Sequence, residues 1–250
     1  MKKEAIILAG GFGTRLKSVV SDVPKPMALV RDIPFLSYLL EQLHKYDFTK
    51  VIIAAGYKSD VIESYYGPFY KKIKLVYSIE KEPLGTGGAI SEASSMIESD
   101  YFFVLNGDTF FKIDFKSMEG NFIKSKSGLS VALKAMVNFD RYGTVITNGE
   151  RITSFNEKAF CEKGLINGGI YLINKSWFRQ RVENKVFSFE KDILEKCVVE
   201  EEITYHKSDG YFIDIGIPED YERAAEELPG IVCPPPPLKG GYPPSPLKGG

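Results

Sequence analysis

A short apolar segment that runs directly into a glycine-rich loop constrains this chain more than any other feature. Residues 5–9 are apolar, and Gly10-Gly11-Phe12-Gly13-Thr14-Arg15 follows them. Glycines lack the β-carbons that would keep a ligand away from the backbone, so such a loop brings bare N–H groups up to a phosphate. Arg15 and Lys25 add two cations to the same region. The pattern predicts an α/β protein that binds a polyanion, most simply a nucleotide.

Two better-known phosphate-binding loops do not fit. The dinucleotide fingerprint G-x-G-x-x-G matches at Gly11 and Gly13, but Leu16 stands at its third glycine position. The apolar segment 51–55 runs into Gly56, so no acidic residue is present to bind a ribose diol. No segment has the spacing of a Walker loop either. These absences argue against a Rossmann dehydrogenase and a P-loop NTPase.

Length and composition favour a soluble globular protein with one substantial core. The chain has 250 residues, of which 44% are hydrophobic and 26% charged, and a net charge of −1 gives no reason to expect nucleic acid or a membrane as partner. The cysteines at positions 161, 197 and 233 are far apart, so we expect reduced thiols in a cytoplasmic protein. The apolar run near the N-terminus is too short for a signal peptide, and no segment could span a bilayer.

Strand and helix alternate along the first two-thirds of the chain. We predict strands over residues 5–9, 51–55, 73–79 and 101–105, and helices over 60–66 and 89–97. A further helix is expected to carry Pro34 in its first turn and an apolar stripe that ends at Leu43. Apolar strands separated by helices predict a parallel sheet covered on both faces.

The pattern changes after residue 128. We predict partly antiparallel strands over 129–137, 144–147, 152–155 and 168–173, a helix over 189–198, short strands over 203–206 and 211–213, and a closing helix over 218–228. Ser188 is a plausible N-cap for the helix over 189–198. No linker interrupts residues 1–228, so we expect a single domain there. Residues 229–250 contain the repeat PPPPLKGG and PPSPLKGG, and we expect a disordered tail.

The candidate chemistry gathers at the carboxyl ends of predicted strands, where open α/β sheets bind ligands. Asp108 and Asp214 each follow such a strand, and a second glycine-rich segment spans residues 83–88. Two carboxylates at one site repel each other unless a cation lies between them, and hard oxygen ligands beside a polyphosphate favour Mg²⁺. The two histidines, His44 and His206, belong to no hydrolytic or zinc arrangement. This inventory fits phosphoryl or nucleotidyl transfer to a substrate that already carries a phosphate.

Seven ordered segments make the chain resemble the sugar-phosphate nucleotidylyltransferases. The segments are residues 8–16, 24–27, 82–89, 106–108, 157–158, 167–169 and 214–216. The resemblance implies a Rossmann-like, doubly wound mixed sheet of the nucleotide-diphospho-sugar transferase type. It also implies an Mg²⁺-dependent reaction in which a nucleoside monophosphate passes from a nucleoside triphosphate to a sugar 1-phosphate and pyrophosphate leaves. A homodimer is compatible with the family.

The resemblance assigns a role to each matching position. Arg15 and Lys25 would be catalytic, and Asp108 and Asp214 would bind the metal. The nucleotide would be held by Leu8, Ala9, Gly10, Gly11, Gly13, Thr14, Gly85, Thr86 and Gly88. The sugar phosphate would be held by Asn106, Tyr142, Gly143, Glu157, Lys158 and Asn167.

Within the family, residues 82–90 and 103–109 most resemble those of the bacterial heptose 1-phosphate guanylyltransferases, which use GTP to make GDP-D-glycero-D-manno-heptose. Uridylyltransferases for N-acetylmuramate phosphate and mannose 1-phosphate guanylyltransferases share much of the first segment. The same chemistry with UTP or CTP and with N-acetylmuramate, mannose or glucose 1-phosphate therefore stays open. A non-catalytic regulator that binds nucleotide sugars is an alternative of another class. The presence of the predicted catalytic and metal-binding residues argues against it; these are Arg15, Lys25, Asp108 and Asp214.

Overall fold

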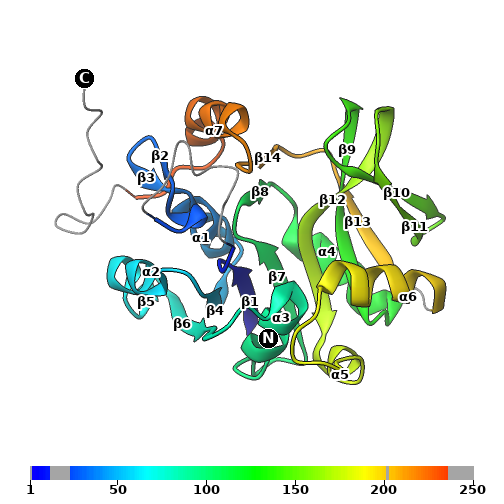
Figure 1. Ribbon diagram of the computed structural model, residues 1–250, viewed down its shortest axis with the longest axis horizontal. Coiled ribbons are helices and arrows are strands. Elements are labelled where there is room, and N and C mark those ends of the chain that lie inside the picture. Colours follow the sequence, from blue (N-terminus) through cyan, green and yellow to red (C-terminus); the bar gives the residue numbers. More distant parts are fainter. Residues whose placement is uncertain (1, 12–22, 201–202, 236–250) are drawn as a thin grey trace.

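A ten-stranded mixed sheet runs through the molecule (Figure 1). The computed structural model describes residues 2–11, 23–200 and 203–235. The sheet has the order β10-β11-β13-β9-β12-β7-β1-β4-β6-β5. Its strands are β1 (Lys3–Leu8), β4 (Phe48–Ala55), β5 (Phe69–Tyr70), β6 (Ile73–Ile79), β7 (Tyr101–Asn106), β9 (Leu129–Phe139), β10 (Gly143–Asn148), β11 (Arg151–Lys158), β12 (Cys161–Asn174) and β13 (Thr204–Ser208).

The half of the sheet around β1 is parallel. β1 lies between β4 and β7 and is parallel to both, and β6 is parallel to β4. Ile6 and Ile7 are both fully buried, yet they belong to different hydrophobic cores. Successive side chains of a strand point to opposite faces, so each face of this half carries its own core. The unbroken apolar runs of the sequence are explained by this double burial.

The helices are divided between the two faces. The core that contains Ile7 receives apolar residues from α1 (Phe35–Lys45), α2 (Ser59–Tyr66), α4 (Phe115–Ser125) and α7 (Pro218–Ile231). The core that contains Ile6 receives them from α3 (Gly85–Ser94), α5 (Lys175–Arg179), the π-helical turn η3 (Phe189–Leu194) and α6 (Glu195–Glu200). This arrangement confirms the predicted doubly wound α/β fold with a mixed sheet. No helix among the described residues is long and apolar enough to cross a membrane.

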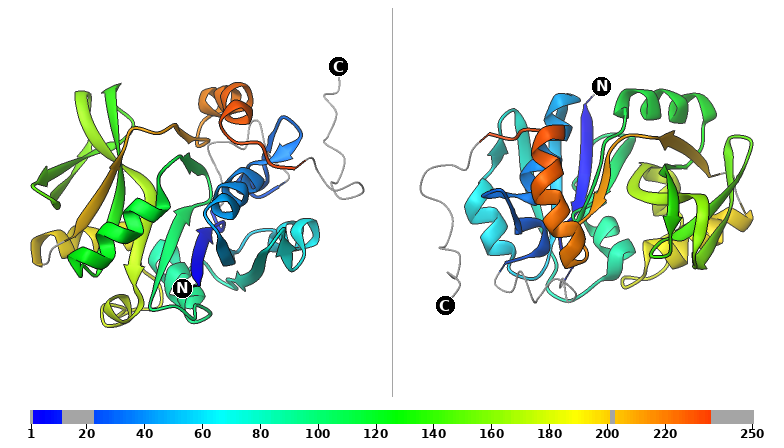
Figure 2. Two further views of the ribbon diagram at one scale, coloured as in Figure 1. Left: turned by 180° about the vertical axis from the view of Figure 1, so that it is seen from behind. Right: turned by 90° about the horizontal axis from the view of Figure 1, so that it is seen from above.

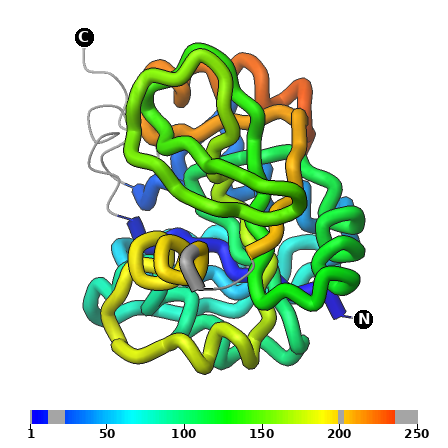
Figure 3. Tube along the Cα trace, turned by 90° about the vertical axis from the view of Figure 1, so that its right-hand side faces the viewer, coloured from blue at the N-terminus to red at the C-terminus, as the bar shows by residue number. Residues whose placement is uncertain are grey.

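The other half of the sheet is largely antiparallel and lies at the opposite end of the molecule from α2 (Figure 2). β12 is antiparallel to both β7 and β9, and it therefore joins the two halves. The register between β9 and β12 shifts between Asn167 and Tyr171, where Gly169 has a φ of 72°. Figure 3, which looks at this end, shows β9 to β11 (green) above α6 (yellow).

A small two-stranded sheet lies beside the main one and brings distant parts of the chain together. β8 (Thr109–Phe111) is antiparallel to β14 (Phe212–Asp214), so that Thr109 stands opposite Asp214. A second two-stranded sheet, β2 (Leu29–Val30) with β3 (Ile33–Pro34), follows the 3₁₀ turn η2 (Lys25–Met27).

The structure corrects several predicted boundaries. Pro34 is the N-cap of α1 and not a residue of its first turn. α3 begins at Gly85, so part of the predicted glycine-rich loop is the first helical turn. α7 extends to Ile231, three residues beyond the predicted end at 228. The predicted helix over 189–198 begins as a π-helical turn, and the predicted cap at Ser188 is confirmed. Residues 229–231, which were predicted to begin the disordered tail, are the end of α7, because Ile231 and Val232 pack against the core that contains Ile7. Residues 236–250 lie outside the described residues, so for them the disordered tail stays a prediction.

Helix α4 was not predicted, although the sequence contains its signals. The Asp114 side chain accepts hydrogen bonds from the backbone N–H groups of Lys116 and Ser117, at 3.0 and 3.1 Å, and so caps the helix. Phe115, Met118 and Phe122 are buried, and their spacing of three and four residues is that of one helical face. The helix covers the same face of the sheet as α1.

Candidate functional site

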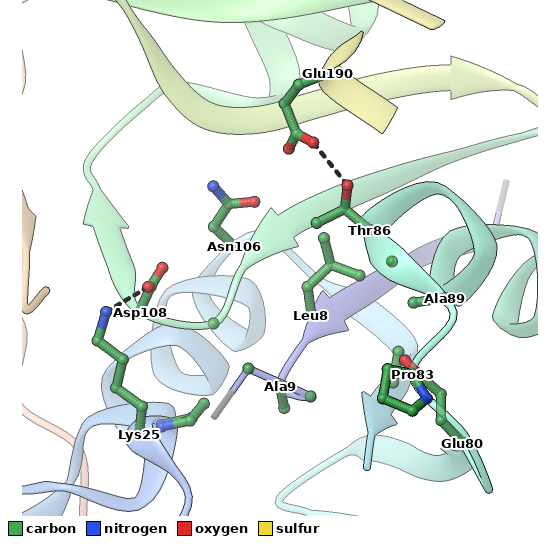
Figure 4. Close-up of a pocket in the computed structure, with 16 residues that line it drawn as sticks. Leu8, Ala9, Lys25, Glu80, Pro83, Thr86, Ala89, Asn106, Asp108 and Glu190 are labelled. Carbon is green, nitrogen blue, oxygen red and sulfur yellow. Dashed lines mark hydrogen bonds and ion pairs between the residues drawn. The ribbon is translucent and has the colours of Figure 1, made fainter. Parts of the chain in front are cut away.

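A pocket of about 330 Å³, the first pocket, opens where β1 and β7 end and α3 begins (Figure 4). It is lined by Leu8, Ala9, Gly10, Gly11, Lys25, Pro26, Ala54, Glu80, Pro83, Gly85, Thr86, Ala89, Asn106, Gly107, Asp108 and Glu190. Of the residues predicted to hold the nucleotide, six line this pocket: Leu8, Ala9, Gly10, Gly11, Gly85 and Thr86. Gly13, Thr14 and Arg15 lie outside the described residues.

The two glycine-rich segments differ in what occupies the space beside them. At Gly11, an added β-carbon would have no heavy atom of residues 2–11, 23–200 or 203–235 within 4 Å, so none of these residues fills the space beside it. At Gly85, where φ is 73°, a β-carbon would lie 2.5 Å from the Phe187 carbonyl oxygen. At Gly87 it would meet the Phe187 ring, and at Gly88 the carbonyl oxygen of Lys185. The second segment is therefore glycine-rich because residues 185–187 pack on it, and Gly88 is not part of the first pocket's lining.

Asp108, Asp214 and Lys25 form a charged cluster at the edge of the first pocket. The Lys25 ammonium donates to Asp108 at 2.6 Å (Figure 4). The backbone N–H of Ile215 donates to the Asp108 carbonyl oxygen at 2.9 Å, which holds Asp108, in the turn before β8, close to Asp214 at the end of β14. A β-carbon on Gly216 would lie 2.9 Å from the Asp214 Oδ1 atom and 3.4 Å from the Lys25 Nζ atom, so both groups lie beside Gly216.

Electrostatics at this cluster fit a bound cation. Burial and the neighbouring Asp108 carboxylate raise the pKa of Asp214, and Lys25 opposes the shift only in part. A cation bound beside Asp214 would offset both the cost of burying its charge and the repulsion from Asp108. No group of three or more metal-binding side chains exists in the described part of the chain. Mg²⁺ is commonly held by one or two carboxylates together with substrate phosphates and water, so the two aspartates suit it.

A second pocket of about 480 Å³ lies next to the first, in the antiparallel half. It is lined by Asn106, Thr109, Tyr142, Gly143, Thr144, Val145, Phe155, Asn156, Glu157, Lys158, Asn167, Gly169, Tyr171, Glu190, Leu194, Glu195, Phe212 and Asp214. All six residues predicted to hold the sugar phosphate are among them. Asn106 and Glu190 line both pockets, so the two cavities share a wall.

The bulge in β12 shapes this shared wall. The Asn167 amide donates to the Tyr171 hydroxyl at 2.9 Å and accepts from the Gly169 N–H at 3.0 Å. A β-carbon on Gly169 would lie 2.8 Å from the Asn106 side-chain nitrogen. Glycine is required at this position because its φ is positive and because Asn106 occupies the space beside it.

Tyr142, which also lines the second pocket, is held by contacts with β14 and α7. Its ring packs edge-on against Phe212 with centroids 5.8 Å apart. The preceding residue, Arg141, pairs with the buried Asp220 of α7 at 2.5 Å, and Arg223 pairs with the same carboxylate at 3.1 Å. Burial and the nearby Asp214 raise the pKa of Tyr142 to about 12, so its hydroxyl keeps its proton at neutral pH and can donate it in a hydrogen bond.

Sequence analysis missed three acidic residues that line the pockets. Glu80 follows β6 directly, and the same rule that drew attention to Asp108 would have found it. Its side chain accepts from the Leu84 N–H at 3.1 Å, and burial raises its pKa. Glu190 and Glu195 lie on η3 and α6, and no local motif marks them.

Known proteins match this chain over nearly its whole length. The profile of the family described as "Nucleotidyl transferase" matches residues 4–230. A D-glycero-alpha-D-manno-heptose 1-phosphate guanylyltransferase of Aneurinibacillus thermoaerophilus is 48% identical over 90% of this chain and 98% of its own length. A protein of the same name from Campylobacter jejuni is also 48% identical, over 87% of this chain and 96% of its own length.

The similarity extends to solved structures. The crystal structure of HddC from Yersinia pseudotuberculosis complexed with GMP-PN has a TM-score of 0.80 and 37% identity to this chain. The match covers 90% of this chain and 99% of that one.

Proposed function

Because this chain belongs to the nucleotidyl transferase family, we propose that it transfers a guanylyl group from GTP to D-glycero-D-manno-heptose 1-phosphate. Pyrophosphate would leave, and a GDP-sugar would form. The observation that carries the proposal is the meeting of two pockets at one charged cluster. Lys25 and Asp108 line the first pocket, and Asp214 lines the second. Asp108 directly precedes β8, which pairs with the strand β14 that ends at Asp214.

This arrangement suits the attack of one phosphate on another. A sugar 1-phosphate oxygen would attack the α-phosphorus of the triphosphate in line, and pyrophosphate would leave on the opposite side. Both reactants are anions, so their approach is opposed by charge repulsion. Lys25 would neutralise charge at the reacting phosphates, as would Arg15, which lies outside the described residues. Mg²⁺, held by Asp108 and Asp214, would supply further neutralisation and orientation when bound.

The first pocket also contains a group that suits guanine. The Glu80 carboxylate lies at the end of this pocket that Gly10 and Pro83 line, and a β-carbon on Gly10 would be 3.3 Å from its Oε1 atom. An ionised carboxylate only accepts hydrogen bonds. Guanine presents two adjacent donors, N1–H and the N2 amino group, whereas uracil presents one N–H between two carbonyl oxygens. A carboxylate at this position favours guanine over uracil.

A pyrophosphate-release assay tests the proposal. The enzyme is incubated with Mg²⁺, with GTP, UTP or CTP in turn, and with heptose, mannose, glucose or N-acetylmuramate 1-phosphate. We expect the highest kcat/KM with GTP and heptose 1-phosphate. A clear preference for UTP or CTP, or for another sugar phosphate, contradicts the assignment, and the absence of turnover with every pair favours the non-catalytic alternative.

We also propose that the protein works in the cytoplasm, where GTP is supplied, and as a homodimer. The guanylyl transfer proposed above requires neither the cytoplasmic location nor the dimer. Light scattering of the purified chain measures the oligomeric state directly, and a monomeric mass contradicts the dimer.

A further inference from the structure

A single turn of π-helix brings acidic side chains into the second pocket. η3 continues directly into α6, and Glu190, Leu194 and Glu195 from these two elements line the pocket. In an α-helix, residues five apart point about 140° away from each other. A π-helix has wider i→i+5 turns, occurs mostly as a single turn, and is frequent at functional sites. The wider turn allows Glu190 and Glu195 to face the same cavity.

Glu190 is fixed in place through one of its two carboxylate oxygens. Its Oε2 atom accepts hydrogen bonds from the Thr86 hydroxyl at 2.6 Å and from the Ser188 hydroxyl at 3.0 Å. Thr86 is itself held because its hydroxyl accepts from the Phe189 N–H at 2.9 Å. Among the described residues, the Oε1 atom of Glu190 has no hydrogen-bond partner. The Glu190 Oε1 atom is therefore a hydrogen-bond acceptor held in place beside both pockets, which Glu190 lines.

The position of Glu190 determines which part of a substrate it can meet. Figure 4 shows Glu190 on one side of Asn106 and the Lys25–Asp108 pair on the other. Phosphates are drawn to the lysine and are repelled by the glutamate, while sugar hydroxyls can donate to a carboxylate. A sugar 1-phosphate would thus lie with its phosphate near Lys25 and its hydroxyl groups toward η3.

Glu195 is the second acidic residue that η3 and α6 contribute to the lining of the second pocket. Its side chain is exposed, whereas Glu190 is half-buried, so Glu195 stands nearer the opening of the second pocket. The atoms of a sugar that lie farthest from its anomeric phosphate are those of the exocyclic arm. A seven-carbon sugar carries one more hydroxyl-bearing carbon in that arm than a six-carbon sugar does.

We propose that Glu190 and Glu195 bind hydroxyl groups of the acceptor sugar, Glu190 at the ring and Glu195 at the exocyclic arm. The π-helical turn would then set the preference for a seven-carbon over a six-carbon sugar phosphate. This inference rests on the proposed function, since it names the groups that select the acceptor of that reaction.

Kinetics with two sugar phosphates test the inference. Glu190→Gln and Glu195→Gln keep the size of the side chain and remove its charge. A hydrogen bond to a charged group corresponds to a factor of roughly 10 to 100 in binding. At saturating GTP, we expect Glu190→Gln to raise KM about tenfold for both heptose and mannose 1-phosphate. We expect Glu195→Gln to lower kcat/KM about tenfold for heptose 1-phosphate and to leave mannose 1-phosphate unchanged.

The matched control is Glu183→Gln, because Glu183 is exposed on the preceding segment and lines neither pocket. It should leave both KM values unchanged. GTP affinity, measured by titration calorimetry with a non-hydrolysable analogue, should be the same in all three variants. Weaker GTP binding by Glu190→Gln with an unchanged sugar KM would place this carboxylate on the ribose and overturn the inference.

The wild-type enzyme separates failure of this inference from failure of the proposed function. A wild type that prefers heptose 1-phosphate, together with an unaltered preference in Glu195→Gln, overturns only the inference. A wild type with no activity on heptose 1-phosphate, or no preference for it, overturns the proposed function and the inference together.

Discussion

The two halves of the sheet build their pockets in different ways. The first pocket lies on the parallel half, where short segments that follow β1, β6 and β7 bring backbone and small residues to one edge. The second pocket lies on the antiparallel half. Its lining comes mainly from β10, which pairs with both β11 and β12, from those two strands, and from η3. The first surface depends on glycines and on backbone, and the second on polar side chains.

This difference has a physical origin. Parallel strands all end at one edge, so any residue that directly follows such a strand is placed near the ligand by topology alone. In the antiparallel half, a residue's position depends on register, on the bulge at Gly169 and on helices packed from elsewhere. The charged cluster of Lys25, Asp108 and Asp214 lies where the two halves meet, which is where we expect substitutions to have the largest effect.

Lys25→Ala and Asp108→Asn should each reduce turnover by roughly 10²- to 10³-fold, because each removes a preorganised charge next to the reacting phosphates. The fold should stay intact, since the cluster lies at a pocket edge and contributes no apolar core. Steady-state kinetics measure the loss, and thermal unfolding checks the fold. Turnover within tenfold of the wild type would remove the residue from the mechanism.

Gly85→Ala and Gly11→Ala should separate packing from ligand binding. At Gly85, the new methyl group would meet the Phe187 carbonyl oxygen and φ is positive, so we expect a loss of about 2–4 kcal/mol in the free energy of unfolding. At Gly11 no described residue stands within 4 Å of the added carbon, so stability should be unchanged while GTP affinity falls about tenfold. Chemical denaturation and nucleotide titration measure the two effects. Equal destabilisation by both variants would contradict the distinction between the two glycine-rich segments.

Sequence reasoning worked best where a motif and a strand end coincide. The central strands, the doubly wound arrangement and the positions of Asp108 and Asp214 follow from apolar runs and from the rule that ligands gather at the carboxyl edge. For Gly85 and Gly88, the predicted nucleotide contacts stay a prediction: Gly85 lines the first pocket, while both glycines also belong to a helical turn on which residues 185–187 pack. Glycine permits close approach of any group, so the sequence cannot say which group approaches.

The second pocket shows what local patterns do not contain. Tyr142, Glu157 and Asn167 were named only through the family resemblance, because nothing in their neighbouring residues marks them as ligands. Glu190 was missed because a charged residue in the first turn of a predicted helix is usually a solvent-exposed one. Its role becomes visible only when Thr86, more than a hundred residues earlier, is seen to hold it.

Glu80→Gln should alter the choice of base more than the rate. The amide can offer either a donor or an acceptor to a base, so it no longer requires two adjacent donors. We expect the ratio of kcat/KM for GTP to that for UTP to fall by roughly 10- to 100-fold, with kcat for GTP little changed. The assay compares both triphosphates at one sugar phosphate concentration. An unchanged ratio would assign base selection to another part of the first pocket.

Arg141→Gln should have the smallest effect, and one confined to the second pocket. Arg141 ties the segment that carries Tyr142 to the buried Asp220 of α7, while Arg223 pairs with the same carboxylate from within α7. Loss of Arg141 should loosen Tyr142 and raise KM for the sugar phosphate about three- to tenfold, with KM for GTP unchanged, since one partly exposed ion pair contributes about 1 kcal/mol or less.

Arg223→Gln is the matched control, because it removes the other partner of Asp220 and leaves the segment that carries Tyr142 attached. If both variants raise KM equally, the effect comes from leaving Asp220 less well paired. A rise in KM for GTP in Arg141→Gln alone would mean that the antiparallel half also supports the nucleotide, and the division between the two halves would not hold.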